Sequence, residues 1–267
     1  MSGITLRPRA PLAARVDLAG VIPSVLAGQS LTAAERIEVP HGGRRVKLAE
    51  LFFVERGLEG VLLIEGGDAR LDHVGAGLDG GEVIVDGPVG ASAGAGMSAG
   101  IVRIAGGAGD FLGAEMAGGR IEVAGNAGDH AGAAGSGSRR GLSGGVLAIR
   151  GNAGARLGER QRGGLITLGG DAGEGLATDM IAGTLALSGT AADGVGRGMK
   201  RGTILVHAAL PLVEGFADTG THDLIALRLI ARRVPDLAGF IGTATRARRL
   251  VGDTLTGGQG EVLVLQG

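Results

Sequence analysis

The sequence predicts an all-β fold, a right-handed parallel β-helix with about seven glycine-rich coils of 19 residues each. Three observations point to this fold: a glycine that recurs every 19 residues, a pair of aliphatic residues after each such glycine, and the composition. Glycine makes up 56 of 267 residues, and the aromatic residues are five Phe without Trp or Tyr, although 44% of the chain is hydrophobic. A recurrence of fixed length is typical of repeat architectures. The recurring glycines are Gly81, Gly100, Gly119, Gly145, Gly164, Gly183 and Gly202.

Each recurring glycine is followed by a short stretch in which aliphatic and variable residues alternate. A period of two predicts a strand with one buried face. One coil cannot bury that face alone, so the aliphatic pairs are expected to stack from coil to coil. A right-handed path is expected because parallel crossovers almost always have that hand. The predicted inward pairs are Val83 and Val85, Val102 and Ile104, Ile121 and Val123, Leu147 and Ile149, Ile166 and Leu168, Leu185 and Leu187, and Ile204 and Val206.

The N-terminal part of the chain is expected to cap one end of the repeats, because an open β-helix exposes an edge at each end. Residues 1–80 would form this cap. They include a degenerate first coil from Gly60, with Leu62 and Ile64 in the inward places. Residues 81–216 would then hold the repeats.

Residues 217–267 are expected to cap the other end. The pattern from His222 to Val234 places Leu224 and Leu227 on one side and arginines on the other, which predicts one amphipathic α-helix. This helix is expected to lie across the open last coil. Residues 261–265 predict a final strand.

One interval between recurring glycines is 26 residues, from Gly119 to Gly145, instead of 19. The seven extra residues fall in the stretch AGAAGSGSRRGLSGG, which is expected to form a loop on one face. Insertions in repeat proteins often lie on the binding face, but a tolerated surface loop explains the insertion equally well.

No catalytic or metal-binding motif is predicted. The absence of Cys excludes disulfides, thiolate zinc sites and a cysteine nucleophile, and the five His are scattered. Glycine-rich stretches such as GNAG recur in successive coils without a following helix, so they indicate turns and not a phosphate loop. The carboxylates at the tenth place of the coils form either an acidic stripe or a set of turn caps; they are Asp110, Asp129, Glu174 and Asp193.

The near-zero net charge and the absence of a long apolar run favour a cytoplasmic protein. The formal net charge of −1 gives no reason to expect nucleic acid or a membrane as a partner. No run of 18 apolar residues is present, and the first residues do not have the pattern of a signal peptide.

Basic residues crowd the last part of several coils and the insertion. Coils that stack in register would bring them to one face. This face is either solvated or paired with a neighbouring subunit, or it is a track for a polyanion. The residues are Arg139, Arg140, Arg160, Arg162, Arg197, Lys200 and Arg201.

The repeats and the C-terminal stretch VGDTLTGGQGEVLVL resemble the family of the C subunit of formylmethanofuran dehydrogenase, which includes the C subunit of the bacterial formyltransferase/hydrolase complex. The repeats are also similar to the β-helix of the glutamate synthase C-terminal domain. The resemblance covers nearly the whole chain and is strongest over residues 81–201 and 250–265.

The resemblance implies a noncatalytic structural subunit in a four-subunit assembly that works in formaldehyde oxidation and one-carbon metabolism. A formyltransferase partner would move formyl between tetrahydromethanopterin and a methanofuran-type carrier, and an amidohydrolase-like partner would release formate. The basic residues would then guide the glutamate tail of the carrier. The alternatives are the C subunit of a redox formylmethanofuran dehydrogenase and a glutamate-synthase-like scaffold.

Overall fold

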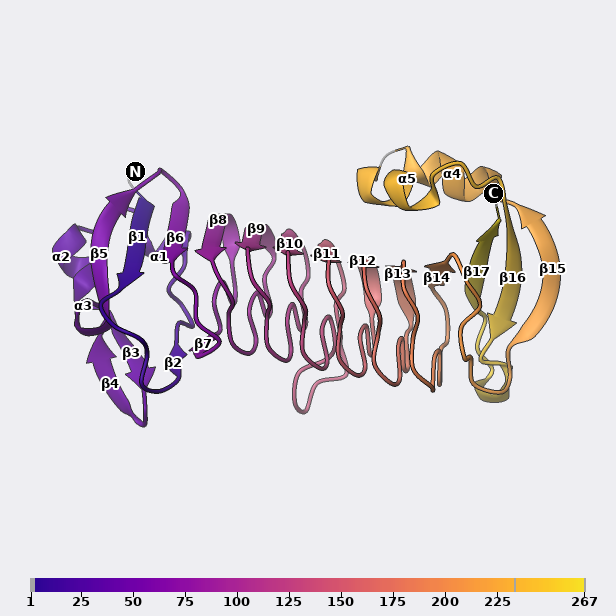
Figure 1. Cartoon of the computed structure of the whole chain (residues 1–267), viewed down its shortest axis with the longest axis horizontal. Helices are drawn as coiled ribbons and strands as arrows, with labels where there is room; N and C mark the ends of the chain where they lie inside the picture. The colour runs from indigo at the N-terminus through magenta and orange to yellow at the C-terminus, as the bar shows by residue number, and fades with distance from the viewer. Residues whose placement is uncertain (1–2, 233, 267) are drawn as a thin grey trace.

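The computed structural model of the chain describes residues 3–232 and 234–266. In this part of the chain the fold is mostly β, with one sheet of 13 strands, one sheet of 4 strands and five short helices. Figure 1 shows the repeats as loops of chain stacked side by side along the long axis, with a non-repeating segment at each end.

The repeats contribute the central strands of the large sheet. Each strand pairs in parallel with the strand of the next repeat, so the sheet grows by one strand for each turn of the chain. The strands are β8 (Asp79–Asp86), β9 (Ala99–Ile104), β10 (Arg120–Val123), β11 (Val146–Ile149), β12 (Arg162–Leu168), β13 (Ala182–Leu187) and β14 (Thr203–Val206).

The predicted stacking of the aliphatic pairs is confirmed. Val102 lies opposite Ile121, Ile121 opposite Leu147, and Leu147 opposite Ile166, each in parallel register. All four side chains are fully buried. A second parallel ladder of isolated bridges joins Ala108, Ala127, Ala153, Ala172 and Ala191. The interior is therefore a column of small aliphatic side chains, which explains why the chain lacks Trp and Tyr.

The N-terminal segment continues the large sheet past the first repeat. The inward places predicted for Leu62 and Ile64 are confirmed, because Leu62 pairs with Val83 and Ile64 with Val85, and both are buried. The strands added at this end are β6 (Val61–Glu65), β1 (Gly3–Pro8) and β5 (Phe52–Gly57). The small sheet is made of β2 (Val16–Asp17), β3 (Glu38–His41), β4 (Arg44–Lys47) and β7 (Leu71–Asp72), and the helices are α1 (Pro23–Leu26), α2 (Leu31–Glu35) and α3 (Leu48–Leu51).

The C-terminal segment differs from the prediction of one helix and one strand. It holds two helices, α4 (Ile225–Ala231) and α5 (Pro235–Ile241), and the predicted helix is shorter than residues 222–234. Its first two residues belong instead to β15 (Ala217–Asp223), and Arg233 lies outside the described residues. No helix in the described part of the chain is long and apolar enough to span a membrane.

The last strands extend the large sheet beyond the repeats. β17 (Gly260–Gln266) contains the predicted strand and pairs in parallel with β14. β16 (Arg246–Gly252) is antiparallel to β17, and β15 is antiparallel to β16. A 3-10 turn, Thr254–Thr256, precedes β17. The strand order of the large sheet is β15-β16-β17-β14-β13-β12-β11-β10-β9-β8-β6-β1-β5.

The sequence predicted a helix across the open last coil. The two C-terminal helices lie instead along the outer face of the sheet (Figure 1). Leu224, directly before α4, and the buried residues Leu237 and Ile241 of α5 form an apolar cluster with outward residues of the repeat strands. The outward residues in this cluster include Leu165 on β12, Ala186 on β13 and Leu205 on β14. The helices settle there because these strands are apolar on both faces.

An ion pair fastens the far end of this helical pair to the sheet. The guanidinium of Arg120 on β10 donates to both carboxylate oxygens of Asp236 at the start of α5, at 2.7 and 3.0 Å. Arg120 also donates to Glu122, which in turn accepts from Arg103. Hydrogen bonding to Arg120 holds the pKa of Asp236 and of Glu122 below the ordinary values, and hydrogen bonding to Asp236 raises the pKa of Arg120.

Replacing Asp236 by Asn is expected to loosen α5 at neutral pH. The pKa of Asp236 is lowered on folding, so its contribution is complete above about pH 4, the ordinary range for Asp, and is lost as the pH falls further. We expect Asp236→Asn to lower the free energy of unfolding by roughly 1–2 kcal/mol at pH 7. The variant should also lose part of the fall in stability that urea denaturation measures in the parent protein below about pH 4.

The matched control is Asp223→Asn, which removes the exposed ion pair with Arg246 at the other end of the helical pair. This change should leave the stability within about 0.5 kcal/mol. Equal effects of the two substitutions would contradict the anchoring role of Asp236.

Candidate functional site

The described residues contain no group of three or more His, Asp and Glu side chains placed to hold a metal ion. The candidate sites are therefore recesses and charged surfaces along the stack of repeats.

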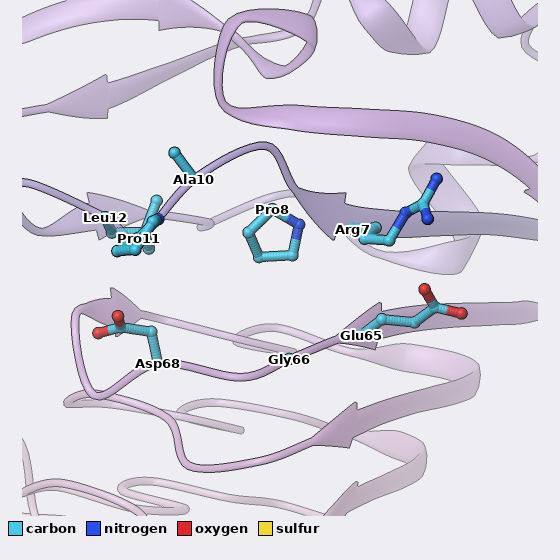
Figure 2. Close-up of a pocket in the computed structure, with 8 residues that line it drawn as sticks. All are labelled: Arg7, Pro8, Ala10, Pro11, Leu12, Glu65, Gly66 and Asp68. Atoms are coloured by element: carbon cyan, nitrogen blue, oxygen red, sulfur yellow. The ribbon is translucent and has the colours of Figure 1, made fainter.

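A pocket of about 450 Å³ opens between β1 and the loop after β6 (Figure 2). Arg7 and Glu65 lie at one end and Asp68 at the other. Arg7 pairs with Glu55 at 3.1 Å, and Asp68 accepts the backbone N–H of Arg70 at 2.8 Å. Two of the charged groups thus have partners already, and the lining holds no imidazole or hydroxyl for acid–base chemistry. The lining residues are Arg7, Pro8, Ala10, Pro11, Leu12, Glu65, Gly66 and Asp68.

The structure brings three of the predicted basic residues together at the insertion. The backbone N–H of Gly141 donates to the carbonyl of Arg160 at 3.0 Å, which lays the end of the insertion against the next repeat. The guanidinium of Arg162 donates to the carbonyl of Arg139 at 3.2 Å. Arg160 also donates to the carbonyl of Ser138, at 3.1 Å. These side chains therefore hold the insertion in place.

Arg140 lies beside Arg139 in the insertion, and the remaining three predicted basic residues form a second group further along the stack. Backbone bonds place Lys200 two repeats from Arg162 in the same column, with Ile181 between them. The ammonium of Lys200 donates to the carbonyl of Thr256 at 2.6 Å. Arg197 and Arg201 are exposed nearby.

Carboxylates separate the two basic groups. Arg160 lies 3.7 Å from Asp179 and 3.9 Å from Glu159, both measured from Nε to a carboxylate oxygen. The basic residues thus form two patches on one side of the stack, with Asp179 between them, and not an unbroken line. Of the predicted basic residues, four are exposed arginines without a side-chain partner in the described part of the chain: Arg139, Arg140, Arg197 and Arg201.

The carboxylates at the tenth place behave as turn caps in two repeats. Asp110 accepts the backbone N–H of Asp129 at 2.8 Å, and Asp129 accepts that of Ala155 at 2.7 Å. A neighbouring column does the same, where Asp171 accepts the backbone N–H of Thr190, a bond that lowers the pKa of Asp171. These contacts favour the structural alternative for Asp110 and Asp129.

A cluster around His130 was not found from the sequence. The rings of Phe111 and His130 stack with centroids 4.9 Å apart and planes 6° apart. Nδ1 of His130 lies 3.2 Å from the carboxylate of Glu159, which is buried and also faces Arg156 at 3.4 Å. This arrangement fixes the imidazole and the phenyl ring on the surface. The sequence signal was their shared place, eleven residues after Gly100 and Gly119.

A buried amide interrupts the column of methionines inside the stack. Gln161 is fully buried at the place that Met97, Met116, Met180 and Met199 occupy in other repeats. Its Nε2 donates to carbonyl oxygens, the nearest being that of Gly163 at 3.0 Å. Its Oε1 has no hydrogen-bond partner among the described residues. The sequence shows Gln161 as the exception in the column, whereas the orphaned acceptor is visible only in the structure.

The fold and these surfaces define a mostly β repeat protein that offers binding surfaces along a rigid stack. No family model matches the chain. A stretch of 86 residues, 32% of the chain, is 41% identical to the C subunit of the formyltransferase/hydrolase complex Fhc from Methylorubrum extorquens strain AM1, and it spans 32% of that relative.

The whole structure is similar to a chain of the crystal structure of the formyltransferase/hydrolase complex (FhcABCD) from Methylorubrum extorquens in complex with methylofuran. The TM-score is 0.90 and the sequence identity 40%, over 98% of this chain and 100% of that chain. The chain therefore belongs to the family of the C subunit of the formyltransferase/hydrolase complex.

Replacing Gln161 by Met is expected to stabilise the protein by about 1 kcal/mol, because it removes an unsatisfied buried acceptor and restores the methionine column. The reverse change in the next repeat, Met180→Gln, should destabilise by about 2 kcal/mol. Urea denaturation of both variants measures these effects. A loss of stability in Gln161→Met would mean that the bonds of Nε2 outweigh the orphaned Oε1.

Proposed function

We propose that this chain is the structural, noncatalytic subunit of a formyltransferase/hydrolase complex of one-carbon metabolism. In this proposal the partner subunits transfer formyl from formyl-tetrahydromethanopterin to a methanofuran-type carrier and then release formate. The observation that supports it most is the match over 98% of the chain to a chain of the FhcABCD complex. Both relatives belong to this complex, so the redox dehydrogenase alternative is not favoured.

The proposal assigns a mechanical role to the repeats. Residues 81–216 would form a right-handed parallel β-helix of about seven coils, with residues 1–80 and 217–267 as caps. The parallel pairing of β8 to β14 supports this architecture. Continuous backbone ladders resist bending, so such a column would hold the transferase and hydrolase subunits at a fixed separation. A cytoplasmic location belongs to the same proposal.

The assembly itself is the first test. Affinity-tagged chain expressed in its native cells should co-purify with three other subunits, identified by mass spectrometry, and the assembly should carry formyl transfer and hydrolysis. The purified chain alone should show neither activity. Turnover by the isolated chain, or its purification as a stable homo-oligomer without partners, would refute the role as a subunit.

We further propose that the two basic patches attract the glutamate tail of the carrier. The related complex was crystallised with methylofuran. Arginine pairs well with carboxylates, and Arg139, Arg140, Arg197 and Arg201 have guanidinium groups available on the surface. The chemistry of these side chains fits an anionic tail, whereas formyl transfer itself would belong to the partners.

In the intact complex, the triple variant with the exposed residues Arg139, Arg140 and Arg197 replaced by Ala should raise the KM for the carrier about tenfold, which corresponds to roughly 0.5 kcal/mol for each charge. The kcat should stay unchanged, and the difference should shrink at high salt. The matched control replaces Arg36, Arg44 and Arg45, three exposed arginines of the N-terminal segment, by Ala. The proposal that these patches contact the carrier is wrong if both triple variants have the KM of the parent complex.

A further inference from the structure

Five repeats, those that begin at Gly81, Gly100, Gly145, Gly164 and Gly183, turn through backbone positions in the left-handed region at the eleventh, thirteenth and fifteenth places after the recurring glycine. The thirteenth place faces the core, where a Cβ added to Gly132 would lie 2.8 Å from Cδ1 of Ile166. The fifteenth place faces outward, since a Cβ on Gly96 would meet nothing within 4 Å. We call the eleventh and fifteenth places of the repeats, together with the matching His73 and Gly77 of the first coil, the turn edge.

Large side chains occupy the turn edge in a conformation that glycine adopts more easily. A residue other than glycine costs roughly 1 kcal/mol in the left-handed region. Other repeats carry glycine at the same places, such as Gly175, Gly194 and Gly198, so the fold does not need a side chain there. All nine left-handed residues other than glycine in the described chain lie in this turn, eight of them on the turn edge: His73, Ser92, Phe111, Glu115, His130, Arg156, Arg160 and Asp179.

Four of these side chains, those of His73, Ser92, Phe111 and Glu115, line a surface groove of about 480 Å³. Its lining comes from three successive turns and from the insertion between the repeats. The insertion is held against it by the backbone N–H of Gly135, which donates to the carboxylate of Glu115 at 3.0 Å. The groove thus contains four left-handed residues of the turn edge from three successive turns. Residues that line it include His73, Ser92, Phe111, Ala114, Glu115 and Ser136.

The groove presents a fixed aromatic ring next to a carboxylate that lacks a cation. The ring of Phe111 is stacked on His130, and Glu159 holds His130 in turn. Among the described residues, no Arg, Lys or His pairs with Glu115. The other ionisable group in the lining, His73, already faces Asp17 at 2.9 Å. A planar guanidinium can bind to both groups, because it stacks on an aromatic ring such as that of Phe111 and pairs with a carboxylate such as that of Glu115.

We propose that this groove receives an arginine side chain from a neighbouring subunit, with its guanidinium on Phe111 and paired to Glu115. The proposal rests on the proposed function, since the neighbour is another subunit of the same complex. It explains why the repeats around the insertion carry strained side chains that the fold does not require.

The test uses the intact complex and two substitutions that the turn tolerates. Phe111→Gly places at the eleventh place the residue found there in later repeats, and Glu115→Gln keeps the shape of the side chain. Each should raise the dissociation constant of the complex about tenfold in mass photometry, while the Tm of the isolated chain does not fall. Glu115→Gln should lose less affinity at high salt. Controls are Glu174→Gln and Asp179→Gly, which change a carboxylate and a left-handed residue of a later repeat, both outside the groove.

Arginine-specific labelling with phenylglyoxal identifies the occupant. One arginine of a partner subunit should be protected in the parent complex and become reactive with Phe111→Gly, as read by peptide mass spectrometry. If the parent chain assembles and both groove variants assemble equally well, the groove proposal is wrong while the proposed function stands. If the variants change only the KM for the carrier, the groove binds a small molecule and the proposal is again wrong. If the parent chain fails to assemble, the proposed function itself fails.

Discussion

The in-register parallel stacking of aliphatic pairs is the constraint on which the rest of the structure depends. Because each repeat returns to the same register, the 26-residue one included, the places of the repeat strands become columns along the stack. Val102, Ile121, Leu147 and Ile166 form one such column in the core. The register that buries this column also determines which residues lie on each outer surface, since a slip by one residue would turn the buried side chains outward.

The inward columns could be predicted from the sequence because a period of two has one physical explanation in a strand. The C-terminal segment could not be predicted in the same way. β15 is exposed at every residue, so no apolar pattern marks it. The place where α4 and α5 pack depends on Leu165, Ala186 and Leu205, which are outward residues of separate repeats. The sequence signal for a covered face is the apolar character of those outward residues, which the pattern of inward residues does not include.

For the candidate site, the sequence predicts only which residues share a column, because strand register determines that and nothing finer. Arg162 and Lys200 lie in one column because each is the seventeenth residue after a recurring glycine, which the repeat length alone determines. Their partners are set by side-chain conformation and by the path of the insertion, which the repeat does not encode. The contacts of Arg160 with Ser138 and Asp179 belong to this class. The sequence did not predict the turn edge, because its places hold glycine in some repeats and larger residues in others. A left-handed backbone conformation is therefore not visible as a residue pattern there.

The stack leaves few surfaces on which a partner can bind without disturbing the core. One face of the sheet is covered by α4 and α5 at β12 to β14, and charged residues such as Arg103 pair with one another on β9 and β10. At the turn edge, by contrast, the fifteenth place is open where Gly96 lies, whereas the thirteenth place of the same turn faces the core at Gly94. Substitutions there change surface chemistry without changing the ladder that holds the repeats together. A repeat protein of this kind can therefore vary its contacts along one edge, and the cost appears as local backbone strain at residues such as Phe111 and Glu115.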